Sequence, residues 1–444
     1  MLYKLHTNFL IVGLLTVGLM AAKASGRAFN LLSLASVFAY CMHIGLILYF
    51  SRAAATVFTE KILFFTVLIY SFTMVALFMN LSLYYCDDTF MFSKADAMVY
   101  SGISMRVVDV GLFANILYIL STFGLPDSGA LIYDSILMSI LPEKLFLNFT
   151  YVIYGALSSI LLFRIGKHFI SDSYAFLAAL AYGTSSYLIF FHCTWLKESL
   201  FVFLVICTMY YFYQFLYEGR FWVAFRVILC LSVLITFRPA VAAFLAMGMV
   251  SYYAITKRGS AMSLFLYMIV AVMFAVAMKG MMEQVDEYSK GGDVKLEQSE
   301  QGQNYSGGFS FFVNIFGGFF GPFPTFFTKT EGIMPTTINF YASGLTYKLF
   351  LVLPFWLGVF YAWKNKLIDM LPMLIFILVE MLATGMVYAS LELRKVLVHM
   401  PFMYIVSFYG LSLFPNLKTK RHMFETSMYS IAVGILILWN LIKI

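Results

Sequence analysis

Residues 197–215 have the sequence KESLFVFLVICTMYYFYQF, in which two charged residues are followed directly by an almost unbroken apolar run. Such a run suits an α-helix that crosses roughly 30 Å of hydrocarbon, because each helical residue adds about 1.5 Å. The whole chain of 444 residues is 62% hydrophobic and 11% charged. Because water-soluble domains carry roughly 25% charged residues, the composition excludes a soluble globule and predicts a polytopic membrane protein.

The apolar runs predict an all-α transmembrane helical bundle that forms one integral membrane domain over residues 1–444. They are too long and too continuous for the alternating strands, of about ten residues each, that build an outer-membrane barrel. We expect about thirteen spans, placed at residues 7–23, 29–50, 62–86, 145–164, 173–192, 199–217, 221–237, 239–256, 261–281, 346–363, 367–390, 398–414 and 424–442.

The short loops predict the orientation. Counted from a cytoplasmic N-terminus, the basic loops fall on one side, as at Arg164, Lys167 and Lys257. Cytoplasmic loops carry an excess of Lys and Arg, so we expect that side to be the cytoplasm and the C-terminus to be periplasmic. The net charge of +7 therefore reflects membrane topology and does not predict a nucleic-acid partner. The first apolar run shows no cleavage site, so we expect it to be retained.

Two long segments fall on the other side, at residues 87–144 and 282–345. The first contains an apolar stretch at 110–125, which we expect to lie as a surface helix on the outer leaflet. The second contains FSFFVNIFGGFFGPFPTFF at 309–327, where Gly and Pro forbid a regular long helix. We expect this phenylalanine-rich stretch to be interfacial or re-entrant and to contact a lipid tail.

Arg238 is the clearest basic candidate. It ends a span in LITFRPAVAAF (234–244), where Pro239 suits the first position of the next helix. A guanidinium at that corner would lie at the membrane surface. It is predicted to bind the phosphate of a substrate, or alternatively to reach the lipid headgroups as a snorkelling side chain.

Two further basic pairs fall on the same side. Lys197 precedes Glu198 at the start of a span, where the two residues either form a salt bridge or helix-start pair or let Lys197 meet an anionic headgroup. Arg394 and Lys395 form the second pair in LELRKVLVHMPF (391–402), with His399 as a supporting residue. Three basic clusters facing one compartment predict a shared anion, such as a lipid phosphate.

Carboxylates supply the other half of the candidate site. Asp87 and Asp88 close the third span, and Asp96 follows them. A carboxylate there would act as general base on an acceptor hydroxyl or would hold a divalent cation, the one cofactor we consider. Alternatively, Asp87 and Asp88 are the hydrated end of a span. Asp109 and Asp134 in the same segment are reserves.

Glu380 and His43 are the ionisable residues deepest within spans. Such residues serve proton-coupled transport in some proteins, and in others they hold helices together by hydrogen bonds. We expect a flippase to carry charged residues on many spans, whereas this chain concentrates them at span ends. Neither a Walker motif nor the GxSxG, HExxH or Rossmann patterns occur, which argues against nucleotide-driven transport and the common hydrolases.

The order of these motifs resembles the GT-C superfamily of membrane glycosyltransferases, which use polyprenyl-phosphate-linked sugars. The similar region covers residues 87–253, a little over a third of the chain. It contains a DA-x-x-Y motif from Asp96 to Tyr100, the loop segment LLFRIGKHFISDSYAFLAALAYGTSSYLIFF (161–191), the Lys197 and Glu198 pair, and TFRPAV around Arg238. In that superfamily's mannose and aminoarabinose transferases the acidic loop follows the first helix and a large soluble C-terminal domain is present. Here two extra spans precede the loop, and no such domain is evident.

The remainder, with RKVLVHMPFMYIVSFYG at 394–410, is more similar to O-antigen and capsule polymerases. The resemblance implies an undecaprenyl-(di)phosphate-linked glycan as substrate, at the periplasmic face of a bacterial inner membrane. It implies Asp96 as base, with Arg238 and Arg394 as catalytic cations and Lys197 and Lys395 as further phosphate ligands. Implied partners are membrane lipid and a chain-length regulator or other polysaccharide-assembly proteins. The expected reaction is repeat-unit polymerisation in O-antigen (lipopolysaccharide) or capsule assembly. The alternatives are single-sugar transfer to lipid or protein, and a lipid-linked oligosaccharide flippase.

Overall fold

The computed structural model describes residues 2–24, 31–90, 94–126, 128–256, 268, 323–324, 334–387 and 396–443. All regular secondary structure within these residues is helical, which confirms the predicted all-α class. The expected span at 261–281 and most of the expected segments at 282–345 and 309–327 lie outside the described residues.

The helices of the first half follow one another closely along the chain. They are α1 (Leu2–Ala24), α2 (Leu31–Ser51), η1 (Ala55–Val57), α3 (Glu60–Cys86), α4 (Lys94–Met105), α5 (Val107–Val110), α6 (Leu112–Phe123), α7 (Ser128–Ile140), α8 (Lys144–Gly166), α9 (Asp172–Gly183), α10 (Ser186–Cys193), α11 (Glu198–Glu218), α12 (Phe221–Ile235) and α13 (Pro239–Thr256). The described helices of the second half are α17 (Met334–Phe350), α18 (Val352–Lys364), η2 (Ile368–Met370), α19 (Leu371–Val387), α21 (Met400–Leu413), η3 (Phe414–Lys420) and α22 (Arg421–Lys443).

Several of these helices are long and apolar enough to cross a membrane, so the chain is a helical membrane protein. Six qualify as single helices within the described residues, namely α2, α3, α8, α11, α13 and α22. Two broken pairs also qualify, α9 with α10, bent by 43°, and α17 with α18, bent by 42°. The described part of the chain therefore holds six to eight candidate spans, fewer than the twelve expected there once the span at 261–281 is set aside.

Part of the difference comes from helix length. The expected spans at 221–237 and 398–414 fold as α12 and α21, which have 15 and 14 residues. At about 1.5 Å per residue such helices reach about 21 to 23 Å, short of roughly 30 Å of hydrocarbon. α21 is buried, whereas most of α12 is exposed or half-buried. An apolar run therefore does not by itself reveal whether a helix reaches both membrane surfaces.

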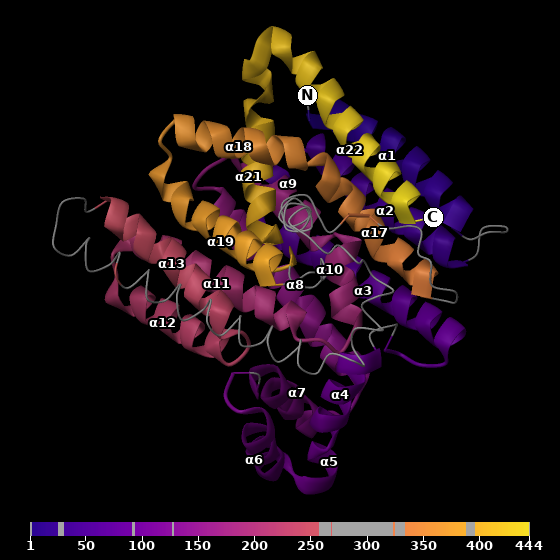
Figure 1. Cartoon of the computed structure of the whole chain (residues 1–444), viewed down its shortest axis with the longest axis vertical. Coiled ribbons are helices and arrows are strands. Elements are labelled where there is room, and N and C mark those ends of the chain that lie inside the picture. Colours follow the sequence, from indigo (N-terminus) through magenta and orange to yellow (C-terminus); the bar gives the residue numbers. More distant parts are fainter. Residues whose placement is uncertain are drawn as a thin grey trace.

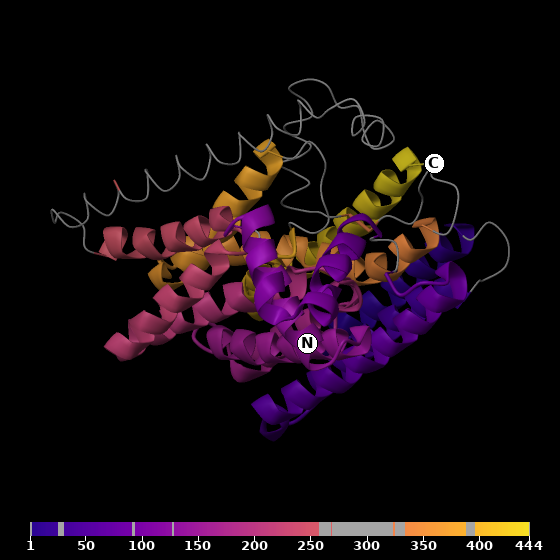
Figure 2. The same ribbon diagram turned by 90° about the horizontal axis from the view of Figure 1, so that it is seen from below.

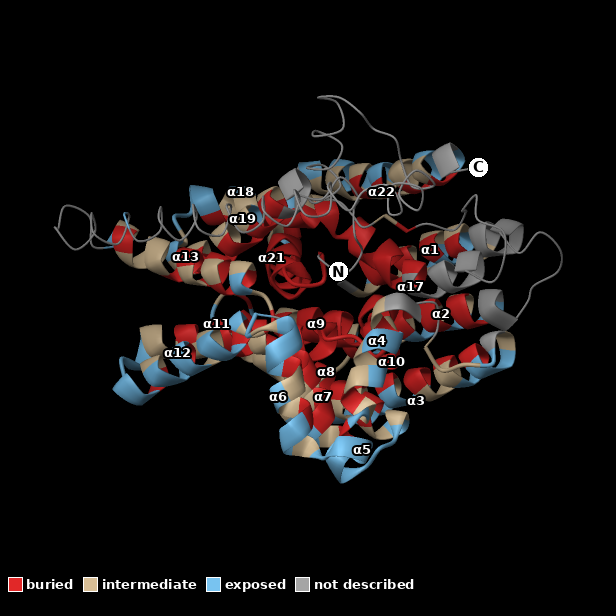
Figure 3. Ribbon diagram, turned by 60° about the horizontal axis from the view of Figure 1, so that its bottom comes forward, coloured by how far each residue is buried: buried red, intermediate tan, exposed pale blue. Residues whose placement is uncertain are grey.

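The core of the bundle is built from α8, α9, α10 and α21, whose residues are mostly buried (Figure 3). The helices α4 to α7 form a separate layer at one end of this bundle (Figure 1) and come forward when the molecule is seen from below (Figure 2). Their segment, 87–144, was expected to carry surface helices. In α6, Phe113 and Leu117 are exposed while Asn115 is buried, so the apolar face of this helix points away from the protein.

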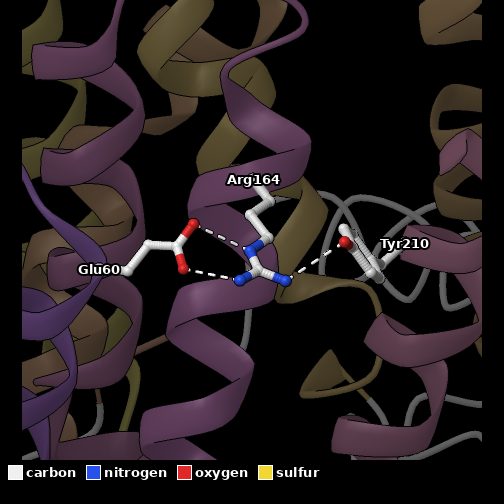
Figure 4. A network of polar contacts seen from close by, with 3 residues as sticks. All are labelled: Glu60, Arg164 and Tyr210. Carbon is white, nitrogen blue, oxygen red and sulfur yellow. Dashed lines mark hydrogen bonds and ion pairs between the residues drawn. The ribbon is translucent and has the colours of Figure 1, made fainter. Parts of the chain in front are cut away.

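The two ends of the bundle carry different charged groups. At one end, where α3 begins and α8 ends, the guanidinium of Arg164 donates to both oxygens of Glu60, at 2.9 and 2.7 Å, and to the hydroxyl of Tyr210 at 3.2 Å (Figure 4). The α3 and α8 helices pack against each other, and they run in opposite directions because the start of α3 meets the end of α8 at this ion pair. The end of α3 at Asp87 and the start of α8 at Lys144 therefore lie together at the opposite end, next to the α4 to α7 layer.

Two glycines let α18 and α21 approach closely. A methyl group added at Gly410 would overlap the backbone carbonyl of Pro354, and one added at Gly358 would overlap that of Val406. Small residues at such contacts are a common way for helices to pack within membranes.

We predict that Gly410→Ala destabilises the bundle by about 1 to 3 kcal/mol, because the backbone of the facing helix cannot move aside without losing its packing. Gly434→Ala is the matched control, since a methyl group there meets nothing within 4 Å. Thermal unfolding of both purified variants in detergent measures the effect. An unfolding temperature for Gly410→Ala equal to that of the control would contradict the close contact.

Candidate functional site

The segment HCTWLKES, residues 192–199, connects α10 to α11, and each of its eight residues is buried. Glu198 is the first residue of α11, as expected for the start of a span. Burying polar and charged side chains is costly unless each finds a partner. The hydrogen-bond and ion-pair partners that come from other elements lie on α7 and at the corner between α12 and α13, so these elements meet at this segment.

Trp195 joins this segment to the α4 to α7 layer. Its indole N–H donates to Oδ2 of Asp134 at 3.1 Å, and the hydroxyl of Tyr151 donates to Oδ1 of the same carboxyl at 2.8 Å. Asp134 lies on α7 and Tyr151 on α8, and both side chains are fully buried. One carboxyl group thus links α7 to α8, the next helix of the chain, and to Trp195, which lies 61 residues further along.

Glu198 and Arg238 form an ion pair, with 3.1 Å between Oε1 and Nη2. The side chain of Glu198 is 1% exposed and that of Arg238 is 23% exposed. The guanidinium lies over the ring of Phe201, 5.3 Å from its centroid. Next to this pair, Nζ of Lys197 donates to the backbone carbonyl of Phe237 at 3.3 Å. Two of the predicted basic residues, Lys197 and Arg238, are thus brought to one place.

The corner that carries Arg238 is fixed from two directions. Pro239 opens α13, as its position after Arg238 predicts. The backbone N–H of Gly129, at the start of α7, donates to the carbonyl of Thr236 at 3.0 Å. A side chain at Gly129 would overlap Thr236 and Phe237, so this contact requires glycine. We call the residues gathered here the Arg238 cluster: Asp134, Tyr151, Trp195, Lys197, Glu198 and Arg238.

The predicted carboxylates at the end of α3 have local partners. Asp87 adopts the left-handed conformation, with φ of 53°, and its N–H closes the last turn of α3 on Leu83. Asp88 accepts the backbone N–H of Phe90 at 2.9 Å through its side chain. These contacts favour the role of a helix end for both residues. Asp96 lies in the first turn of α4, where a negative charge is favourable to the helix dipole.

The remaining predicted site residues lie outside the Arg238 cluster or outside the described residues. Arg394 and Lys395 lie outside the described residues. His399 is buried and its Nδ1 is hydrogen-bonded to Glu380. Lys348, also buried, lies near enough to Glu380 for an electrostatic interaction. Lys348, Glu380 and His399 thus form a second buried polar group, which we call the Glu380 group.

Other polar contacts within the bundle join helices. Nδ1 of His43 is hydrogen-bonded to the hydroxyl of Thr184 at 2.9 Å, which ties α2 to the break between α9 and α10. This contact matches the structural alternative considered for His43. Among the residues that the structure describes, no three or more His, Cys, Asp or Glu side chains gather in a way that could hold a metal ion.

Burial has the largest effect on the pKa of Asp134. It raises the pKa of this carboxyl from its ordinary value to about 7, although the hydrogen bonds from Tyr151 and Trp195 favour the charged form and lower the pKa. The charge of Asp134 therefore changes near neutral pH. In the Arg238 cluster, Asp134, Lys197 and Glu198 are buried, and Arg238 is partly exposed.

Sequence reasoning did not identify Tyr151, Trp195 and Lys348, and it kept Asp134 only as a reserve. The sequence holds a signal for Asp134 and for Trp195, since Asp134 interrupts an apolar helical stretch and Trp195 lies two residues before the charged pair Lys197 and Glu198. No protein-family model matches the chain, and no curated protein matches its sequence.

We predict that the side chains of Glu198 and Arg238 are energetically coupled by about 1 to 3 kcal/mol, because removing either one leaves a poorly solvated charge behind. A double-mutant cycle with Glu198→Gln and Arg238→Gln, followed by thermal unfolding, measures this coupling. The control is the exposed pair Glu218 and Arg220, which are 3.4 Å apart with Arg220 75% exposed. Equal coupling energies in the two cycles would show that the Glu198 pair is not protected from solvent.

Proposed function

We propose that this chain is a membrane glycosyltransferase that acts on undecaprenyl-linked saccharides at the periplasmic face of a bacterial inner membrane. Its proposed reaction is the polymerisation of repeat units in O-antigen or capsule assembly. The observation that carries the proposal is the Arg238 cluster, in which two cations and two carboxyl groups lie buried or nearly so at one end of a membrane bundle. The order of motifs that resembles the GT-C superfamily runs through the same residues.

The chemistry that this cluster suits is displacement at an anomeric carbon. An acceptor hydroxyl forms a new bond to that carbon while the bond from the carbon to the phosphate oxygen of the lipid carrier breaks. The hydroxyl proton passes to a carboxylate, and the bonding electron pair leaves with the phosphate. Positive groups already fixed around the departing phosphate stabilise the charge that grows there, which is usually the largest contribution a site can make.

Arg238 is the described residue best suited to hold the phosphate. Its side chain is partly exposed, and Glu198 and Phe201 hold the guanidinium from the protein side. A planar guanidinium also offers paired donors to phosphate oxygens. Lys197 lies beside it, and the proposal keeps Arg394 and Lys395 as further phosphate ligands. Asp96 keeps the role of general base.

Glu198 has a supporting role in this scheme. It holds Arg238 through its Oε1, and because its side chain is buried it positions the guanidinium and does not itself touch the substrate. The exposed apolar face of α6, with Phe113 and Leu117, supports a position of this layer against lipid, where the carrier's tail runs.

Transport of a lipid-linked oligosaccharide is the second candidate, and one observation favours it. Lys348, Glu380 and His399 are all buried within the bundle, on α17, on α19 and directly before α21. Ionisable residues inside membrane bundles often mark ion or proton pathways. Single-sugar transfer uses the same residues as polymerisation, so only the product distinguishes those two reactions.

We predict that Arg238→Ala abolishes transfer and leaves membrane insertion normal, because the guanidinium is required at the phosphate and not for forming the spans. The measurement is a gel of surface polysaccharide from a deletion strain carrying either the native chain or the variant. The ladder should collapse to a core with one repeat unit. Arg226→Ala is the matched control, since Arg226 is exposed on the neighbouring α12.

The same gel separates the alternatives. A ladder that persists with every band shifted by the mass of one sugar assigns the chain to single-sugar transfer. An unchanged profile in the deletion strain removes the support for surface polysaccharide and favours transport or protein glycosylation. Full activity of Arg238→Ala at native protein levels would overturn the assignment of Arg238 to the substrate phosphate.

We also predict that the deletion strain accumulates lipid-linked repeat units on the periplasmic leaflet, because a polymerase acts after its substrate has crossed the membrane. Binding of a lectin or an antibody to the saccharide in intact spheroplasts, compared with inverted vesicles, measures the sidedness. A strain that lacks the first sugar transferase of the pathway gives the background. Accumulation of lipid-linked repeat units on the cytoplasmic leaflet would instead identify a defect in transport and favour a transport role for the Glu380 group.

A further inference from the structure

Asp134 occupies an unusual position for an acidic residue. Its carboxyl is fully buried, and both of its oxygens accept hydrogen bonds from side chains of other elements, Tyr151 on α8 and Trp195 in the 192–199 segment. No step of the proposed reaction uses this group. Because no solvent or substrate reaches a fully buried carboxyl directly, its effect must pass through the side chains that it holds.

We propose that Asp134 is a positioning residue, whose carboxyl holds Trp195 and thereby fixes where Lys197 and Glu198 lie relative to Arg238. This inference rests on the proposed function only for its activity measurement. The claim that Asp134 fixes the position of the 192–199 segment is tested without substrate.

The connectivity supports this role. Trp195 precedes Lys197 by two residues and Glu198 by three, so the hydrogen bond to Asp134 constrains the short segment just before the charged pair. The same helix, α7, also holds the corner that carries Arg238, through the bond from Gly129 to Thr236. One helix therefore fixes both halves of the Glu198 and Arg238 pair.

Hydrogen bonds from Asn115 also tie α7 to the other helices of the α4 to α7 layer. The side-chain amide of Asn115 on α6 donates to the hydroxyl of Ser135 at 3.0 Å and to the carbonyl of Ile103 at 2.9 Å. The residue next to Asp134 is thus tied to α6 and to α4. A displacement of the surface layer would be transmitted through α7 to the Arg238 cluster.

The charge of Asp134 depends on pH in the neutral range, since burial raises its pKa to about 7. The unfolded chain releases this proton near pH 4, so between about pH 4 and 7 the folded state binds more protons than the unfolded state. The contribution of this group to stability is therefore complete below about pH 4 and is lost as pH rises through about 7.

Other titratable groups surround α7. Burial raises the pKa of the Tyr133 hydroxyl, the neighbour of Asp134 on this helix, so it stays neutral in the neutral range. The titratable and charged groups on the elements that pack against α7, or next to it on the chain, include Lys94, Asp96, Tyr100, Arg106, Asp109, Tyr118, Tyr133, Glu143, Lys144, Tyr151, Tyr154, Arg164, Lys197, Glu198 and Arg238.

Two substitutions separate position from charge. In Asp134→Asn, the amide oxygen still accepts the indole N–H of Trp195, and the amide N–H₂ donates to the hydroxyl of Tyr151, so both contacts persist without a charge. In Asp134→Leu, both donors lose their acceptor, and a buried donor without a partner is unfavourable. Trp195→Phe combined with Asp134→Leu removes one orphaned donor and should be milder for folding than Asp134→Leu alone.

The test uses the full chain in detergent micelles with 5-fluorotryptophan at its five tryptophans. The ¹⁹F resonance of Trp195 is assigned by its loss in Trp195→Phe. We expect this resonance to shift with pH, with a midpoint near 7 as set by Asp134. The shift should be absent in Asp134→Asn and present in the control Glu143→Gln, which changes an exposed acid in the same segment. In Asp134→Leu the resonance should broaden or move.

Activity gives the second readout, from the polysaccharide gel. Asp134→Leu should lower polymer formation by about tenfold to a hundredfold, because a small displacement of the phosphate-binding groups is enough for such a loss. Asp134→Asn should restore most of it. If Asp134→Leu leaves both the Trp195 resonance and the ladder at native values, the positioning role is overturned. If the Trp195 resonance does not titrate between about pH 5 and pH 9, the assignment of that titration to Asp134 is overturned.

The two proposals fail in different ways. An unchanged polysaccharide profile in the deletion strain removes the proposed function, whereas the ¹⁹F measurement on Trp195 still decides the role of Asp134. If Arg238→Ala alters the ladder but the Trp195 resonance is the same in the native chain and in the Asp134 variants, the proposed function is supported and the positioning role is overturned.

Discussion

A charge placed inside a helical bundle is costly unless a partner or a set of donors comes with it, and the 192–199 segment brings two charges. Glu198 is matched by Arg238 from the corner before α13, and Lys197 reaches a backbone carbonyl of that corner. Trp195 in the same segment needs an acceptor, which Asp134 supplies. The need to satisfy this segment holds the α4 to α7 layer, α8 and the α12 to α13 corner together.

Breaks in the spans follow a similar constraint. Where α9 gives way to α10, backbone groups lose their helical partners, and within a membrane bundle these groups must be satisfied by the protein. Hydroxyl groups gather there: Thr184 is bonded to His43, and Ser186 is bonded to Ser343 and accepts the N–H of Gly344 on α17. The broken helices are therefore joined to their neighbours by polar contacts at the places where regular helix stops.

Much of the local structure was predictable because it depends on neighbours in the sequence. Pro after Arg238 predicts a helix start, and Lys197 with Glu198 marks the start of α11. The pairings were not predictable, because Asp134 and Trp195, or Glu380 and His399, are linked by folding of the chain and not by spacing. The number of spans was overestimated within the described residues, since apolar composition does not distinguish a short buried helix such as α21 from one that crosses the membrane.

The sequence by itself determined that this is an all-helical membrane protein, because so apolar a chain can satisfy its backbone in lipid only within helices or closed barrels, and its runs have helical length. It also placed Lys197, Glu198 and Arg238 at helix ends. Only the tertiary structure decided that Asp134, Trp195, Glu198 and Arg238 come together. The physical reason is that burial, which selects partners for charged groups, is a property of the packed bundle and not of any single helix.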